Sequence, residues 1–250
     1  NMEQYLQPTA FMNFNHPAVA AFAREKSGGT SDPVRQAVNL YYAVRDSIYY
    51  DPYAIVLTID GLCASTTLAQ KRGWCVAKAV LLAACCRHLG IPARLGFADV
   101  KNHLSTKRLR ERMKTDVFYW HGYTSIYVND QWVKATPAFN IELCQKFSLK
   151  PLEFDATADS IYHPFDLAGN RHMEYVNERG EFADVPLDLI IKTFLEKYPE
   201  AGTAWLNADF DRDVARETGA EKKITNRHRS RRAQEKPPRP GRFLVPNASD

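Results

Sequence analysis

Residues 72–79 read Arg-Gly-Trp-Cys-Val-Ala-Lys-Ala, and the rest of the chain can be interpreted outward from this stretch. From Cys75 the sequence runs to Gly90 without proline or glycine, and it is rich in alanine, leucine and other strong helix formers. A glycine that ends such a run, followed closely by Pro92, is a typical helix stop signal. The pattern predicts a helix of about four turns that begins at Cys75.

A cysteine in the first turn of a helix lies where unpaired backbone N–H groups and the helix dipole stabilise a thiolate. Such a thiolate is an activated nucleophile if a base can reach it. The alternative is that Cys75 is a small buried apolar residue, as most free cysteines are. A histidine partner would decide between the two interpretations.

The 250 residues are 45% hydrophobic and 25% charged, which is ordinary for a globular chain large enough to bury a core. We expect one domain over residues 1–220, with its core at about 70–140, and a tail over 221–250. The tail holds nine Lys/Arg against three acidic residues, a net of +6, so residues 1–220 sum to −2. Because the tail has few apolar residues, it is predicted not to fold. No aromatic side chains are interleaved with its arginines, so nucleic-acid binding is not favoured.

No apolar run is long enough to span a bilayer, and the first residues do not resemble a secretion signal. The cysteines are odd in number and lack the spacing of a zinc site or a disulfide framework: Cys63, Cys75, Cys85, Cys86 and Cys144. We therefore expect a cytoplasmic protein with reduced thiols, no metal site and no membrane partner. His163 and His172, which lie among acidic residues, are interpreted as parts of hydrogen-bonded loops.

The remaining pattern predicts a mixture of helices and strands. Helices are expected at about 17–26, from Asp32-Pro33 onward, and at 65–70, 141–150 and 187–198. Strands are expected at 93–100, 117–128 and 131–136, the last two joined as a hairpin. The charged residues 105–116 read as a loop or helix, and 153–180 as loop-rich.

The hairpin places polar residues beside a histidine. If residues 129–130 form a two-residue turn, Thr136 lies opposite Tyr123, on the same face as His121. Extrapolated further, the register puts Asn140 on that face as well. Thr136 and Asn140 are therefore the two candidates for orienting the imidazole.

A cysteine at a helix start, a histidine on a strand and a polar group beside it match the requirements of thiol acyl transfer. Cys75 would attack a carbonyl or thioester, and His121 would take up and return a proton. The backbone N–H of Cys75, with the indole N–H of Trp74, would stabilise the oxyanion.

Three further polar residues follow at or near the end of the predicted strand 93–100. Asp99, Asn102 and His103 would either line the cleft or belong to a loop that satisfies its own backbone. Arg94, near the start of the same strand, is interpreted as half of a structural ion pair rather than as a substrate clamp.

Several stretches closely resemble the transglutaminase-like superfamily, a circularly rearranged relative of papain-type enzymes. They are Gly-Trp-Cys at 73–75, Leu-Gly-Ile-Pro-Ala-Arg at 89–94, Trp-His-Gly-Tyr at 120–123 and Gln-Trp-Val-Lys at 131–134. The resemblance implies that Cys75 is the nucleophile and His121 its base. Where the family usually carries aspartate this chain has Thr136, which can orient an imidazole but cannot stabilise its charge. Asn140 is the alternative, as in papain-type sites.

We therefore expect an α+β, papain-like fold in which the Cys75 helix packs on an antiparallel sheet that carries His121. The expected function is acyl transfer through a Cys75 thioester, without a cofactor, on an amide-, peptide- or thioester-containing substrate. It would end in transamidation, amide formation or hydrolysis. The alternative is a binding or scaffold module that kept this fold and lost turnover.

Overall fold

The computed structural model describes residues 1–102, 105–161, 167–169, 173–198 and 209–219. The predicted tail at 221–250 lies outside these ranges, as do His103, His163 and His172.

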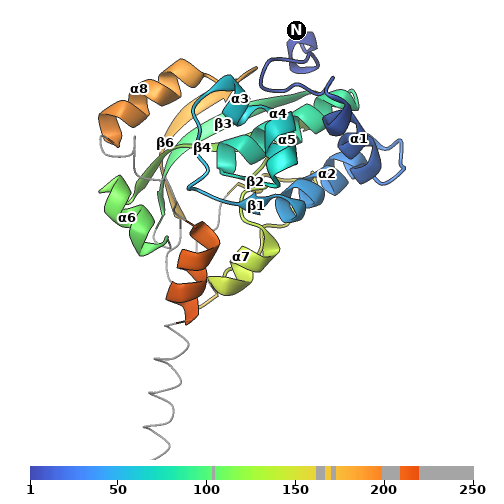
Figure 1. Cartoon of the computed structure of the whole chain (residues 1–250). Helices are drawn as coiled ribbons and strands as arrows, with labels where there is room; N and C mark the ends of the chain where they lie inside the picture. Colours follow the sequence, from blue (N-terminus) through green and yellow to red (C-terminus); the bar gives the residue numbers. More distant parts are fainter. Residues whose placement is uncertain (103–104, 162–166, 170–172, 199–208, 220–250) are drawn as a thin grey trace, which may run out of the picture.

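A four-stranded antiparallel sheet forms one layer of the molecule (Figure 1). Its order is β5-β4-β3-β6, and the strands are β3 (Ala93–Asn102), β4 (Val117–Val128), β5 (Gln131–Ala135) and β6 (Met173–Phe182). A separate short pair joins β1 (Tyr49–Tyr50) and β2 (Arg72–Gly73) in parallel, directly before the cysteine of interest.

The helix that begins at Cys75 packs against the sheet and is surrounded by other helices (Figure 1). Packed around α5 (Cys75–His88) are α1 (Pro17–Lys26), α2 (Pro33–Ser47) and α4 (Ala64–Gln70). The other helices are α3 (Ile59–Leu62), α6 (Lys107–Met113), α7 (Ile141–Lys146), α8 (Leu187–Lys197), a short 3-10 helix at Glu3–Tyr5 and a helical segment at 210–219. This arrangement confirms the predicted α+β fold, with the Cys75 helix packed on an antiparallel sheet.

Helix α5 is buried on all sides because its sequence is apolar on all sides. Residues 75–87 are all buried, which includes the adjacent thiols of Cys85 and Cys86. The helix ends as predicted at Gly90, whose φ of +76° is a conformation that glycine adopts without strain. Because the helix is enclosed by packed side chains, it holds its first residue, Cys75, in a rigid position.

Lys78 is fully buried on α5, one turn after Cys75. Its ammonium donates hydrogen bonds to the carbonyl oxygens of Arg45 (2.9 Å), Ala138 (2.8 Å) and Ile48. Burial lowers the pKa of Lys78 well below its usual value, while the three carbonyls compensate its charge. One side chain thus fixes the start of α5 to three separate points of the backbone.

The hairpin has the predicted register. Thr124 pairs with Ala135, and the ladder continues from there to Val128 and Gln131. The turn at residues 129–130 has positive φ at both positions, +51° and +59°, as a two-residue type I′ turn requires. Thr136 then leaves the ladder, and its N–H donates to the carbonyl of Ser160 at 2.9 Å.

The loop-rich prediction for 153–180 is wrong at its C-terminal end, because β6 pairs there with β3. The strand is half-exposed at the edge of the sheet and is rich in charged residues, so it lacks the alternation that signals a strand. Its pairing depends on backbone hydrogen bonds and on ion pairs to β3, one of which joins Arg94 to Glu181. Arg94 is therefore a structural residue, as expected.

Candidate active site

The sulfur of Cys75 lies against strand β4 at the residue that follows His121. The Gly122 N–H donates to Cys75 Sγ at 3.5 Å. This approach requires a glycine, because a Cβ at Gly122 would come within 3.0 Å of the Val76 Cα atom. Cys75 is fully buried and His121 is 3% exposed. The structure therefore brings the two predicted catalytic residues to one helix–sheet contact.

The expectation of a stabilised thiolate is wrong for this closed site. Burial raises the pKa of Cys75 to about 12, although the N–H groups of Gly122, Val76 and Cys75 itself act to lower it. The helix N-terminus therefore offsets only part of the desolvation that accompanies full burial. In the closed site the sulfur carries its proton at neutral pH, and a base has to remove it during attack.

A β-bulge in β4 sets the direction of the chain immediately before His121. Tyr119 and Trp120 together stand opposite Asp99, because Ala98 pairs with His121 and the register shifts beyond it. Trp120 adopts a φ of +59°, which is rare for a bulky side chain. Bulges of this kind re-aim neighbouring side chains and are frequent beside active sites.

Asp99 holds this bulge in place. Its carboxylate is 4% exposed and accepts the Trp120 N–H at 3.1 Å. The same carboxylate accepts from Arg179 through Nε at 2.9 Å and through NH2 at 2.8 Å, and the Arg179 guanidinium lies 5.0 Å from the centre of the Trp120 ring. Asp99 lies within β3 rather than in a loop after it, and it acts on the backbone that carries His121.

The two candidates for orienting His121 are both buried but have different partners. The Thr136 hydroxyl donates to the Ile161 carbonyl at 2.7 Å, and its oxygen can still accept a hydrogen bond. The Asn140 side-chain oxygen accepts the Tyr50 N–H at 3.0 Å. The Asn140 side chain is therefore tied to β1, and its oxygen already accepts one hydrogen bond.

Trp74, the residue before Cys75, is fully buried between aromatic rings. Its ring centre lies 6.2 Å from that of Phe118 and 5.9 Å from that of Phe194. Among the described residues its indole Nε1 has no hydrogen-bond partner. Buried donors nearly always have partners, so one left unpaired beside a nucleophile is available to a reacting oxygen.

Asn102 and His103 are the other residues predicted to line the cleft. Asn102 ends β3, where its N–H donates to the Asp116 carbonyl at 3.0 Å, and it lines a small cavity together with Tyr50 and Phe139. His103 lies outside the described residues.

Two tyrosines that the sequence analysis did not single out lie near the sulfur. Burial raises the pKa of Tyr50 and of Tyr198, and the negative charge of a Cys75 thiolate would raise both further. Tyr50 is on β1, and Tyr198 follows α8. They approach Cys75 from elements distant in sequence, so local sequence patterns contain no signal of their position.

No group of three His, Cys, Asp or Glu residues in the described part of the chain is arranged to hold a metal ion. Asp155 and Asp159 instead accept hydrogen bonds from Thr157 and from the Lys134 N–H, as predicted for this loop. All five cysteines are free and buried. No helix among the described residues is long and apolar enough to cross a membrane.

Comparison with known proteins agrees with the motifs. The family model of the transglutaminase-like superfamily matches residues 20–137. Among solved structures, a candidate cysteine protease from Cytophaga hutchinsonii is similar at 15% identity with a TM-score of 0.42. The match covers 72% of this chain and 54% of that protein, so the chain spans about half of its length. No curated protein gives a significant match. The resemblance seen in the sequence is thus confirmed: residues 20–137, which hold Cys75, His121 and Thr136, match the transglutaminase-like superfamily.

Proposed function

We propose that this protein is a thiol acyltransferase or amidase in which Cys75 is the nucleophile and His121 the base. The observation that carries the proposal is the hydrogen bond from the Gly122 N–H to Cys75 Sγ, which places the sulfur beside the strand position of His121. The superfamily match over both residues supports a cysteine-based activity.

The reaction follows from the groups present. His121 takes the thiol proton as Cys75 Sγ attacks the carbonyl carbon of an amide or thioester. Because the pKa of Cys75 is raised to about 12, this proton transfer accompanies the attack rather than preceding it. The oxyanion is stabilised by Trp74 Nε1–H and the Cys75 N–H. His121 returns the proton to the leaving amine or thiol, and an acyl-Cys75 thioester remains.

A second acceptor then releases the acyl group. His121 removes a proton from water or from an amine, which attacks the thioester, and the thiol of Cys75 is restored. Water gives hydrolysis, whereas an amine gives transamidation or amide formation.

Thr136 is the better candidate for orienting His121. Its hydroxyl donates to the Ile161 carbonyl and its oxygen can still accept a hydrogen bond, whereas the Asn140 oxygen already accepts one from the Tyr50 N–H. Thr136 is also within the matched residues, which end before Asn140. Without a carboxylate to stabilise the imidazolium, the base is weaker than one held by aspartate.

The test is to trap the intermediate. Incubation with acyl thioesters, followed by mass spectrometry of the intact and digested protein, is expected to show an acyl adduct on Cys75. Cys75→Ala should abolish the adduct and His121→Gln should slow its formation at least a hundredfold. Cys86→Ala, a buried cysteine on the same helix, is the matched control and should acylate normally. No adduct in the wild-type protein, or equal rates in the His121 variant, would refute the proposal.

The full burial of Cys75 and the threonine at position 136 favour a second candidate, a binding module that no longer turns over. This candidate predicts slow alkylation of all five cysteines at similar rates. The proposed enzyme instead predicts that Cys75 is alkylated faster than Cys85 and Cys86, and that His121→Ala removes the difference.

A further inference from the structure

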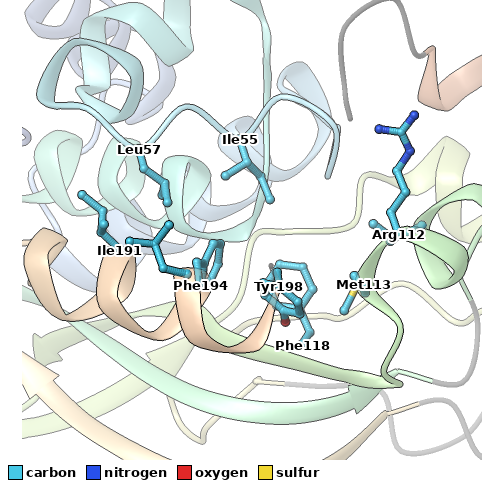
Figure 2. Close-up of a pocket in the computed structure, with 10 residues that line it drawn as sticks. Ile55, Leu57, Arg112, Met113, Phe118, Ile191, Phe194 and Tyr198 are labelled. Carbon is cyan, nitrogen blue, oxygen red and sulfur yellow. The ribbon is translucent and has the colours of Figure 1, made fainter. Parts of the chain in front are cut away.

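A cavity of about 370 Å³ lies beside the candidate active site, among α8, α6, the start of β4 and the segment at residues 55–57 (Figure 2). Its volume is within the range of small-ligand pockets. The walls include Ile55, Leu57, Phe118, Ile191, Phe194 and Tyr198. We call it the apolar pocket.

The apolar pocket is continuous with the residues that surround Cys75. Two of its wall residues, Phe118 and Phe194, are the rings that flank Trp74 at 6.2 Å and 5.9 Å. Trp74 immediately precedes the nucleophile and carries the unpaired indole N–H. A ligand in the pocket would therefore contact rings that pack directly on the residue before Cys75.

The described side chains that form the walls are apolar apart from Tyr198 and Arg112. The Tyr198 hydroxyl accepts the Tyr119 N–H at 2.8 Å and donates to the Val117 carbonyl at 2.9 Å, so both of its roles are filled. Arg112 is the one charged wall residue, and its guanidinium extends away from the apolar side chains (Figure 2). A carboxamide or carboxylate placed among the apolar side chains, away from Arg112, would lose its hydrogen bonds to water and gain none from those side chains.

We infer that the apolar pocket binds the uncharged aliphatic part of the acyl donor, so that the preferred substrates are acyl groups with a medium-length alkyl chain or a leucine-like side chain next to the carbonyl. That the bound group belongs to an acyl donor rests on the proposed function, whereas the binding of an aliphatic group depends on the pocket alone. Each methylene buried in such a pocket strengthens binding about fourfold.

The first experiment measures binding without chemistry. Full-length protein carrying Cys75→Ala is titrated calorimetrically with acetamide, hexanamide, octanamide and N-acetyl-leucinamide. The dissociation constant of hexanamide should be at least tenfold below that of acetamide. Octanamide and N-acetyl-leucinamide separate the two sources of an aliphatic group. Tighter binding of octanamide would indicate a fatty acyl chain, and tighter binding of N-acetyl-leucinamide would indicate a peptide. Equal, weak binding of all four amides would overturn the inference.

Matched variants locate the binding. Ile191→Trp fills the pocket and should weaken hexanamide binding at least tenfold. Leu189→Trp changes the same helix at a residue that is 49% exposed and does not line the pocket, and it should leave binding unchanged. Circular dichroism confirms that both variants are folded. Equal loss in the two variants would show that the amides bind elsewhere.

A second experiment separates this inference from the proposed function. Wild-type protein is offered acetyl, hexanoyl and succinyl thioesters, and Cys75 acylation is followed by mass spectrometry. Fastest acylation by the hexanoyl thioester supports both proposals. Selective amide binding without any acylation would refute the proposed function, but it would still support an aliphatic ligand for the apolar pocket. Acylation by the acetyl and succinyl thioesters that is as fast as acylation by the hexanoyl thioester would refute the inference but not the proposed function.

Discussion

Asp99→Asn tests whether the bulge at Trp120 positions His121. The substitution retains an oxygen that can accept the Trp120 N–H, but it removes the charge that pairs with Arg179. Breaking a buried ion pair costs about 3–5 kcal/mol, and the 26% exposure of Arg179 reduces this to about 2–3 kcal/mol. For a domain of this size the melting temperature should fall by about 5–10 °C.

The catalytic effect should exceed the effect on stability. If the proposed function is correct, relaxation of the bulge displaces the backbone that carries His121, and a displacement of about 1 Å costs roughly a hundredfold in rate. Single-turnover acylation of Cys75 is measured at 25 °C, well below the melting temperature, together with the substrate concentration at half-maximal rate. The maximal rate should fall at least tenfold while the half-maximal concentration stays the same.

Glu181→Gln is the matched control for this variant. It removes the ion pair to Arg94 in the same β3–β6 ladder, where the two side chains are 20% and 21% exposed. We expect a loss of about 1 kcal/mol and no change in acylation rate, because Arg94 keeps its contact with the Trp132 ring at 3.9 Å. An unchanged maximal rate in Asp99→Asn, or an equal loss in Glu181→Gln, would refute the positioning role.

Three further predictions concern the close contact at Gly122, the residue that orients His121, and the pH dependence of stability. Gly122→Ala forces a Cβ against Val76 and should lower the free energy of unfolding, measured in urea, by about 1–3 kcal/mol. It should also abolish acylation. An unchanged free energy of unfolding would contradict the close contact. Thr136→Ala should lower the maximal acylation rate, whereas Asn140→Ala should mainly lower stability, and the reverse order would exchange their roles. Cys75 keeps its proton to a pKa of about 12 when folded and to about 8.5 when unfolded, so the free energy of unfolding should fall as pH rises from about 9 to 12. Cys75→Ala should remove that part of the pH dependence, and an identical profile in this variant would contradict the raised pKa.

The sequence was sufficient to predict the elements whose signals are local. The start of α5 at Cys75 follows from helix propensity between a glycine turn and a glycine stop, and the hairpin register follows from a two-residue turn. Once both are fixed, Cys75 lies against the strand that carries His121, one residue from it, whereas the roles of the two side chains stay a prediction.

Features that depend on tertiary contacts could not be predicted. Strand β6 has no apolar alternation of its own and is held by its pairing with β3. The bulge at Trp120 exists because Asp99 and Arg179, from two neighbouring strands, hold it there. The raised pKa of Cys75 depends on complete enclosure, which the residues next to it in sequence do not reveal.

Lys78 also limits how a reactant can reach the sulfur. Its ammonium holds the first turn of α5 to the carbonyls of Arg45, Ile48 and Ala138, and each bond would have to break before that turn could tilt outward. The first turn of α5 is therefore firmly held, and we expect any opening around the thiol to involve the neighbouring segments instead. We expect hydrogen exchange to be slower in α5 than in α8, and a substrate of the proposed enzyme would then reach Cys75 from the α8 side.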